Sequence, residues 1–202
     1  MAMTDEEYML RAVELAKKGT GWTNPNPLVG AVIVKGGRII GEGYHKKYGG
    51  LHAEREALAS ANEDVSGATI YVTLEPCCHY GKQPPCVNAI IEAGIKRVVI
   101  GSYDPNPLVA GKGVDSLREH HITVDDKLVC SEECKSLNYV FFNYIKEKKP
   151  YVILKYAQSL DGKIATHTGL SQWITGETAR NKVHMDRHRY SAVMVGVETV
   201  IH

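Results

Sequence analysis

The sequence lacks a long apolar run, a basic leader and an excess of charge. No apolar stretch approaches the roughly 20 residues that a membrane helix needs. The first ten residues carry acids where a secretory signal peptide would carry bases. Lys plus Arg total 24 against 23 Asp plus Glu, so the formal charge of +1 gives no global attraction to polyanions. We therefore expect a cytoplasmic protein without a membrane or nucleic-acid partner.

Disulfide pairing is also poorly supported. The chain has five Cys, an odd number, and Cys77, Cys78 and Cys86 crowd into one short segment. A chain of 202 residues with 44% hydrophobic residues can bury a core without covalent cross-links. Metal ligation or reactive thiols explain this clustering better than a disulfide framework does.

Helical and strand patterns alternate through the first 145 residues. Thr4 and Glu7 predict a capping box at the start of a helix, and Gly36-Gly37 predicts a tight hairpin turn. The expected helices cover residues 4–18, 52–62, 84–93, 114–119 and 132–145, and the expected strands cover 28–34, 38–44, 69–74, 97–101 and 122–124. This order predicts an α/β domain of three layers, in which helices cover both faces of a sheet.

A charged segment that ends in a helix breaker, Lys146-Glu147-Lys148-Lys149-Pro150, indicates a domain boundary. We expect a first domain over residues 1–147 and a second unit over 148–202. In the second unit the pattern predicts a strand at 151–156, a helix at 177–190 and a strand at 192–197.

One His, one Glu and two Cys form the motif that carries chemistry. His52-Ala53-Glu54 is followed, after a predicted strand, by Pro76-Cys77, and Cys86 lies nine positions further on. Three protein ligands leave the fourth tetrahedral position of zinc open for water, as in catalytic zinc sites. Glu54 is placed to move protons between that water and a leaving group. This layout is typical of zinc deaminases that act on nucleobases.

Other interpretations of these residues stay open. Cys78 and His79 are rival ligands, and either one as a fourth ligand would close the site and make it a structural zinc module. A His at a helix start often only forms hydrogen bonds, and Cys residues often only fill cores. We interpret Cys130 and Cys134, which have helical spacing, as structural.

At these motifs the sequence resembles the cytidine deaminase-like superfamily, whose fold has a mixed central sheet. Within it, the chain is most similar to the bifunctional deaminase/reductase family of riboflavin biosynthesis, and the likeness covers the whole chain. Three features carry this resemblance: the segment from Asn24 to Gly30 (NPNPLVG), the eight-residue gap between the cysteines, and Asp104-Pro105-Asn106-Pro107 with Gly111-Lys112-Gly113. Transfer-RNA adenosine deaminases instead have a two-residue gap between their cysteines.

The resemblance implies hydrolytic deamination of 2,5-diamino-6-(5-phosphoribosylamino)pyrimidin-4-one to the corresponding uracil derivative and ammonia. It implies zinc as the cofactor and a small phosphorylated pyrimidine as the binding partner. The substrate-binding residues that it implies are Asn26, His45, Lys82, Asp104 and Asn106. Amide and carboxylate groups suit ring edges, and Lys82 and His45 can offer positive charge to a phosphate. Alternatively, Lys82 is a solvated loop charge and the two Asn are turn residues beside proline. A deaminase of another nucleotide or base is the rival function.

After Pro150 the sequence resembles the start of the family's reductase domain, which has a dihydrofolate reductase-like fold and uses NADPH. The resemblance implies that Ala157, Trp173 and Thr199 contact NADPH and that Ser171 and Arg187 face the substrate phosphate. Without it, Ala157 and Trp173 would be interpreted as core residues and Arg187 as helix surface. About 50 residues are too few for an open α/β sheet with a nucleotide site, so we expect no competent reductase from this chain alone. Unpaired strand edges there predict association, and we expect a homo-oligomer.

Overall fold

The structure, a computed structural model, describes residues 3–107, 109–125 and 127–201 and divides into two compact units. The first unit is Met1–Pro150 and the second is Tyr151–His202. Within the described ranges, every helix is too short or too polar to traverse a lipid bilayer.

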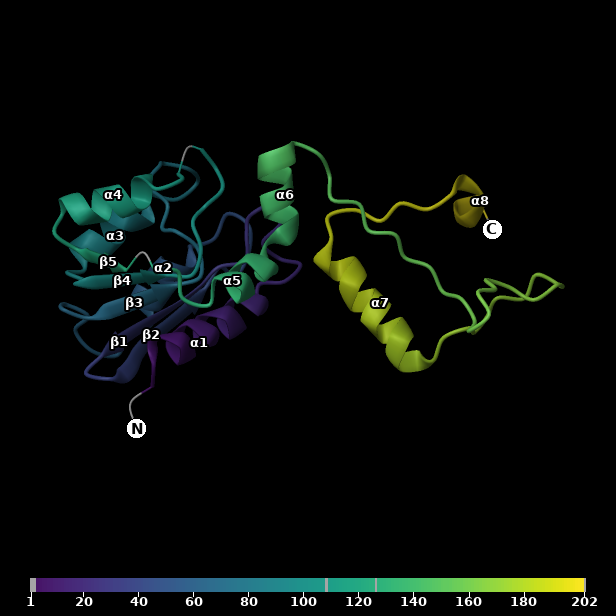
Figure 1. The fold of residues 1–202 in the computed structure, drawn as a ribbon, viewed down its shortest axis with the longest axis horizontal. Helices are drawn as coiled ribbons and strands as arrows, with labels where there is room; N and C mark the ends of the chain where they lie inside the picture. Colours follow the sequence, from purple (N-terminus) through teal and green to yellow (C-terminus); the bar gives the residue numbers. More distant parts are fainter. Residues whose placement is uncertain (1–2, 108, 126, 202) are drawn as a thin grey trace. The chain divides into compact units, whose positions relative to one another are not determined.

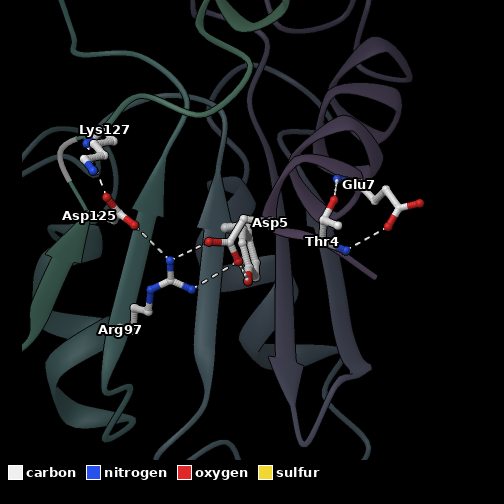
Figure 2. Close-up of polar contacts among 7 residues, drawn as sticks. Thr4, Asp5, Glu7, Arg97, Asp125 and Lys127 are labelled. Carbon is white, nitrogen blue, oxygen red and sulfur yellow. Dashed lines mark hydrogen bonds and ion pairs between the residues drawn. The ribbon is translucent and has the colours of Figure 1, made fainter. Parts of the chain in front are cut away.

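Helix α1 (Asp5–Lys17) begins at the predicted capping box. The Thr4 N–H donates to the Glu7 carboxylate at 2.7 Å, and the Glu7 N–H donates to the Thr4 hydroxyl at 3.3 Å (Figure 2). These two bonds satisfy N–H groups that a helix start leaves without partners. Met9, Ala12, Val13 and Ala16 are buried, as the helical spacing predicted.

The predicted hairpin follows as β1 (Gly30–Lys35) and β2 (Arg38–Tyr44), which pair antiparallel. The two turn residues, Gly36 and Gly37, have φ values of +56° and +75°. Successive positive φ angles match a tight hairpin turn, in which glycine has no steric penalty.

The sheet contains β3 (Thr69–Val72), β4 (Arg97–Ile100) and β5 (Thr123–Asp125) in addition to the hairpin. The strand order is β2-β1-β3-β4-β5. Strand β1 runs antiparallel to β3, whereas β3, β4 and β5 are parallel. The carboxyl ends of β3 and β4 therefore meet at one edge of the sheet, where the loops that follow them can form a site.

Helices cover both faces of this sheet (Figure 1). On one face Ala31, Ile33, Ile70 and Val98 pack with α2 (Ala53–Ala59), α3 (Cys86–Glu92) and α4 (Lys112–Glu119). On the other face Val32, Val34 and Tyr71 pack with α1 and α5 (Ser131–Leu137). The alternation of sides along β1 follows the two-residue period of a strand. The predicted three-layer α/β fold with a mixed sheet is confirmed.

The prediction of one helix over residues 132–145 is wrong, because the chain forms α5 and then α6 (Tyr139–Glu147) with Asn138 between them. The buried Asn138 side chain accepts a hydrogen bond from the Leu28 N–H at 2.7 Å and donates one to the Leu28 carbonyl at 2.8 Å. Asn138 has φ −123°, outside helical values. The two hydrogen bonds to the backbone of Leu28, which precedes β1, thus interrupt the helix at Asn138.

A polar cluster around Arg97, the first residue of β4, joins four elements. Arg97 donates to both carboxylate oxygens of Asp5, at 3.1 and 2.6 Å, and to Asp125 at 2.9 Å (Figure 2). The Tyr71 hydroxyl also donates to Asp5 at 2.5 Å. This cluster connects the start of α1 with β3, β4 and β5 on the sheet face that α1 covers.

The second unit contains α7 (Glu177–Arg189), close to the predicted helix at 177–190, and a short α8 (Val197–Ile201). The predicted strands at 151–156 and 192–197 are wrong for the described residues, because no strand forms over 151–201. A strand requires hydrogen-bonded neighbours, and an isolated two-stranded pair is marginal even when it forms. The apolar side chains of these segments, such as Leu154 and Met194, are exposed.

Candidate active site

Three side chains far apart in sequence converge at the carboxyl edge of the sheet. The Nδ1 atom of His52 lies 3.5 Å from the Sγ atom of Cys77 and 3.3 Å from the Sγ atom of Cys86. All three potential ligand atoms lie within 4.8 Å of one another. Within the described ranges, this is the one group of three or more His, Cys, Asp or Glu that is arranged to hold a metal ion.

Two helix starts and a strand end position these groups. His52 is the N-cap of α2 with an extended backbone, and Cys86 is the first residue of α3, directly after Pro85. Cys77 follows β3 and accepts a hydrogen bond from the Cys86 N–H at 3.3 Å. Helix N-termini carry unpaired N–H groups and a partial positive charge, so they favour thiolate.

The two thiols have very different proton affinities. Hydrogen bonds from the Cys86 thiol and from His52 lower the pKa of Cys77 to about 4. The adjacent Cys77 thiolate, together with burial, raises the pKa of Cys86. The thiolate is the form of cysteine that binds a metal cation, so the lowered pKa of Cys77 suits it to act as a ligand.

This donor set fits zinc. Imidazole nitrogen and thiolate sulfur are ordinary zinc ligands, and tetrahedral zinc would place its nitrogen and sulfur ligands about 3.6 Å apart. The observed nitrogen–sulfur distances of 3.3 and 3.5 Å are close to that spacing. Three protein ligands leave one coordination position open, which is typical of catalytic sites.

Glu54 is the buried carboxylate beside the three ligands. It lies in the first turn of α2 and is 3% exposed. Burial, and then the negative charge of Cys77, raise the pKa of Glu54 to about 7. A carboxyl group with such a pKa can both accept and release a proton near neutral pH.

A pocket of about 280 Å³ opens onto His52, Glu54 and Cys77. Its walls come from the loops that follow β2, β3 and β4 and from the segment before β1. The five residues expected to bind substrate all line this pocket: Asn26, His45, Lys82, Asp104 and Asn106. A second hollow of about 390 Å³ lies between α5 and α6 and contains none of the expected site residues.

Burial favours the neutral form of the His45 ring. Burial lowers its pKa, and its Nδ1 atom donates to the Leu51 carbonyl oxygen at 2.8 Å. The Nε2 atom is then the acceptor for the Asn26 amide, at 3.2 Å. The structure therefore favours a neutral hydrogen-bonding role for His45 over the positive charge that we expected it to offer a phosphate.

Lys82 is the cation at the pocket wall. Its Nζ atom lies 4.0 Å from the centre of the Tyr48 ring, a cation–π arrangement. The neighbouring Gln83 amide donates to the Gly49 carbonyl at 3.2 Å. These two contacts join the loop between the cysteines to the turn after β2, so Lys82 is held at the pocket by more than its own flexible chain.

The rival ligands lie apart from the trio. Cys78 packs against the core and is absent from the converging group, and burial raises its pKa. His79 lines the pocket without joining that group. Cys134 is buried in the core between α1 and α5, with Cys130 packed against it.

The residues expected to serve a reductase lie in the second unit. Ala157 is partly buried, whereas the side chains of Ser171, Trp173, Arg187 and Thr199 are exposed. The Arg180 guanidinium lies 4.4 Å from the centre of the Trp173 ring.

Several pocket residues were not predicted from the sequence, among them Tyr48, Glu75 and Phe141. Tyr48 could have been noticed, because it is an aromatic residue next to Gly49-Gly50, just before the His52 motif. The Glu-Pro-Cys order was a weaker signal for Glu75. Phe141 reaches the pocket from α6, and no local pattern could have indicated it.

Known proteins match both units. Residues 2–102 match the cytidine and deoxycytidylate deaminase zinc-binding region, and residues 150–202 match the RibD C-terminal domain. The riboflavin biosynthesis protein RibD of Actinobacillus pleuropneumoniae is 62% identical over 98% of this chain and 53% of its own length. The protein of that name from Aquifex aeolicus is 56% identical over 98% of this chain and 55% of its own. The chain thus spans about half the length of the curated relatives that it matches.

Solved structures give the same result. A crystal structure from Thermotoga maritima, of a diaminohydroxyphosphoribosylaminopyrimidine deaminase/5-amino-6-(5-phosphoribosylamino)uracil reductase, is 56% identical with a TM-score of 0.91. The match covers 98% of this chain and 56% of that one. The chain therefore belongs to the zinc-binding cytidine and deoxycytidylate deaminase family and, within it, to the RibD family.

Proposed function

We propose that the first unit is a zinc-dependent deaminase that converts 2,5-diamino-6-(5-phosphoribosylamino)pyrimidin-4-one to 5-amino-6-(5-phosphoribosylamino)uracil and ammonia. The observation that carries this proposal is the convergence of His52, Cys77 and Cys86 beside the buried Glu54, at the base of a pocket. The relatives named for riboflavin biosynthesis and the structure titled as a deaminase/reductase support the substrate.

His52, Cys77 and Cys86 would hold the zinc ion in this reaction. Bound zinc lowers the pKa of a water molecule at its open position toward about 7. Glu54 is the proton carrier, because its raised pKa lets a carboxylate oxygen accept a proton from the attacking water and release it to the leaving amine. Water oxygen bonds to the ring carbon, the exocyclic carbon–nitrogen bond breaks, and ammonia leaves with the transferred proton.

Polar side chains of the pocket would select the substrate. The Asn26 and Asn106 amides and the Asp104 carboxylate can pair with ring and ribose groups, because together they offer both donors and acceptors. Neutral His45 would orient Asn26 through the hydrogen bond between them. The Lys82 ammonium would attract the phosphate.

For the second unit we propose the amino-terminal part of an NADPH-dependent reductase domain, because residues 150–202 match the RibD C-terminal domain. In that domain Ala157, Trp173 and Thr199 would contact NADPH, and Ser171 and Arg187 would face the substrate phosphate. Homo-oligomer formation and a cytoplasmic location stay predictions of the sequence.

The test of the deaminase proposal measures ammonia release from the diaminopyrimidine phosphate by the zinc-loaded chain. Competing cytidine, deoxycytidylate and free pyrimidine bases should leave the rate unchanged if the proposed substrate is correct. Faster ammonia release from one of these competitors would favour the rival function, a deaminase of another nucleotide or base.

A further inference from the structure

Glu75 is a second buried carboxylate near the metal-binding trio, but its surroundings differ from those of Glu54. It lies between the end of β3 and Cys77 and is 3% exposed. Its own N–H donates to the Ser102 carbonyl at 2.9 Å, which extends the pairing of β3 with β4 by a few residues. The backbone of Glu75 is thus fixed by the sheet.

Both oxygens of the Glu75 carboxylate accept backbone N–H groups, Oε2 from the connection between β4 and α4 and Oε1 from the first turn of α4. Oε2 accepts from Asp104 at 3.3 Å and from Gly111 at 3.1 Å. Oε1 accepts from Gly113 at 3.1 Å and from Val114 at 3.4 Å. With its oxygens so occupied, Glu75 is a poor candidate for proton transfer, which distinguishes it from Glu54.

These contacts also complete the start of α4. The N-cap of this helix is Gly111, which has no side chain to accept the first-turn N–H groups. The carboxylate of Glu75 takes that role from outside the helix and places negative charge at the positive end of the helix dipole. A Cβ atom at Gly113 would overlap the Pro76 carbonyl oxygen, so the helix start packs directly against the segment that leads to Cys77.

The segment held by Glu75 carries two residues of the pocket wall. Asp104 and Asn106 line the pocket, and the Asn106 N–H donates to the Asp104 carboxylate at 2.8 Å. Asn106 in turn accepts the Val109 and Ala110 N–H groups at its carbonyl, each at 2.8 Å. The hydrogen bonds of Glu75 hold the backbone at Asp104 and at Gly111, and therefore restrict the pocket residues Asp104 and Asn106.

We propose that Glu75 is a positioning residue, whose buried carboxylate sets the 104–111 loop, with Asp104 and Asn106, in register with the metal-ligating segment that begins at Pro76. This inference rests on the proposed deamination. It concerns substrate binding through other residues and assigns Glu75 no contact with the reacting atoms.

Glu75→Gln is the sharpest variant, because it keeps the size of the side chain and replaces one acceptor oxygen by a donor that faces N–H groups. Loss of hydrogen bonds to a charged group predicts a rise in KM of about tenfold or more, with kcat within about threefold of the original. Zinc content is expected to be unchanged, and amide hydrogen exchange in residues 104–114 is expected to accelerate.

Asp5→Asn is the matched control. It weakens the partly exposed polar cluster that Asp5 forms with Arg97 and Tyr71, and none of these three residues lines the pocket. We expect a lowered melting temperature with unchanged KM and unchanged exchange in 104–114. If Glu75→Gln does not fold, Glu75→Asp keeps the charge with a shorter reach and is expected to raise KM in the same direction.

An unchanged KM in a folded Glu75 variant would overturn the proposal. Substitution of a residue with only a structural role is expected to lower the stability and the fraction of active protein and to leave KM unchanged. Unchanged exchange in 104–114 would overturn it as well. If the original chain itself released no ammonia, the proposed function would be wrong, and the exchange measurement would still decide whether Glu75 holds the loop.

Discussion

The Nδ1 atom of His52 lies 3.3 Å from the Sγ atom of Cys86, although 34 positions separate the two residues. The two residues begin different helices, and Cys77 approaches them from the end of β3. The sheet therefore brings a spaced sequence motif together as a compact set of one imidazole and two sulfur ligands. A pocket lined by hydrogen-bond donors and acceptors opens onto His52 and Cys77.

Replacing any one ligand is expected to abolish zinc binding. Cys77→Ser and Cys86→Ser each remove a thiolate that prefers zinc, so the metal content is expected to fall from about one ion per chain to below about 0.1. Mass spectrometry of the metal after gel filtration measures this content. Cys78→Ser is the control, because Cys78 neighbours Cys77 but lies outside the converging group.

Zinc loss in the Cys78 variant would show that Cys78 is a zinc ligand and would contradict the assignment of Cys77. X-ray absorption on the original chain gives an independent check, since the account predicts three protein ligands and one exchangeable oxygen. Four protein ligands would instead describe a structural zinc module.

Glu54→Gln is expected to keep zinc and lose activity. The amide cannot shuttle protons, and loss of general acid–base catalysis reduces rates by about 10²- to 10⁴-fold. Ammonia release and zinc content are measured on the same sample. Glu56→Gln is the control on the same helix: Glu56 pairs with Lys46 at 2.6 Å, and its variant is expected to stay within about twofold of the original rate. A Glu54 variant with full activity would exclude the proton-carrier role.

Asp5 predicts a specific dependence of stability on pH. The hydrogen bond from Arg97 lowers the pKa of Asp5 below its ordinary value of 3.8. A carboxyl group whose pKa is lower in the folded state than in the unfolded state stabilises the fold at pH values above its unfolded-state pKa. This stabilisation is lost as the pH falls through the folded-state pKa. Because both partners are partly exposed, the contribution is about 1 kcal/mol or less. In urea unfolding, we expect the original chain to have a larger free energy of unfolding than Asp5→Asn near about pH 7. We expect this difference to shrink toward about pH 2.5. A constant difference would contradict this assignment.

Asn138→Ala is expected to destabilise the first unit strongly. It leaves the N–H and the carbonyl of Leu28 buried without partners, at a cost of about 2–4 kcal/mol in the free energy of unfolding. Urea unfolding followed by circular dichroism measures the loss. Asn143→Ala is the control, because this residue is partly exposed and makes one long bond of 3.3 Å to Lys149. Equal, small effects of the two substitutions would show that the bridge to Leu28 contributes little.

Most of the first unit follows from local sequence signals. The Thr4 capping box, the Gly36-Gly37 turn and the two-residue alternation along β1 each act over a few residues, so a pattern can reveal them. The ligand trio follows from the residue types and their order, because few chemistries use one His and two Cys around a strand. The cap, the turn and the strand alternation are each contained in a short window of the chain, whereas the trio is indicated by the chemistry of its residues and their order.

Features that depend on distant partners could not be predicted in this way. The break at Asn138 depends on Leu28, 110 positions earlier, and Phe141 reaches the pocket only because that break redirects α6. The lowered pKa of His45 depends on burial, and the hydrogen bonds of the Glu75 carboxylate depend on N–H groups beyond β4. Residues 151–156 and 192–197 have strand patterns without pairing partners in the described second unit.

The most direct test of the account is a paired measurement on the purified chain: zinc content, and ammonia release from 2,5-diamino-6-(5-phosphoribosylamino)pyrimidin-4-one before and after chelation. The account predicts about one zinc ion per chain, ammonia release that chelation abolishes, and recovery when zinc returns. Undiminished ammonia release from a metal-free chain, or a zinc-loaded chain that releases none, would contradict it.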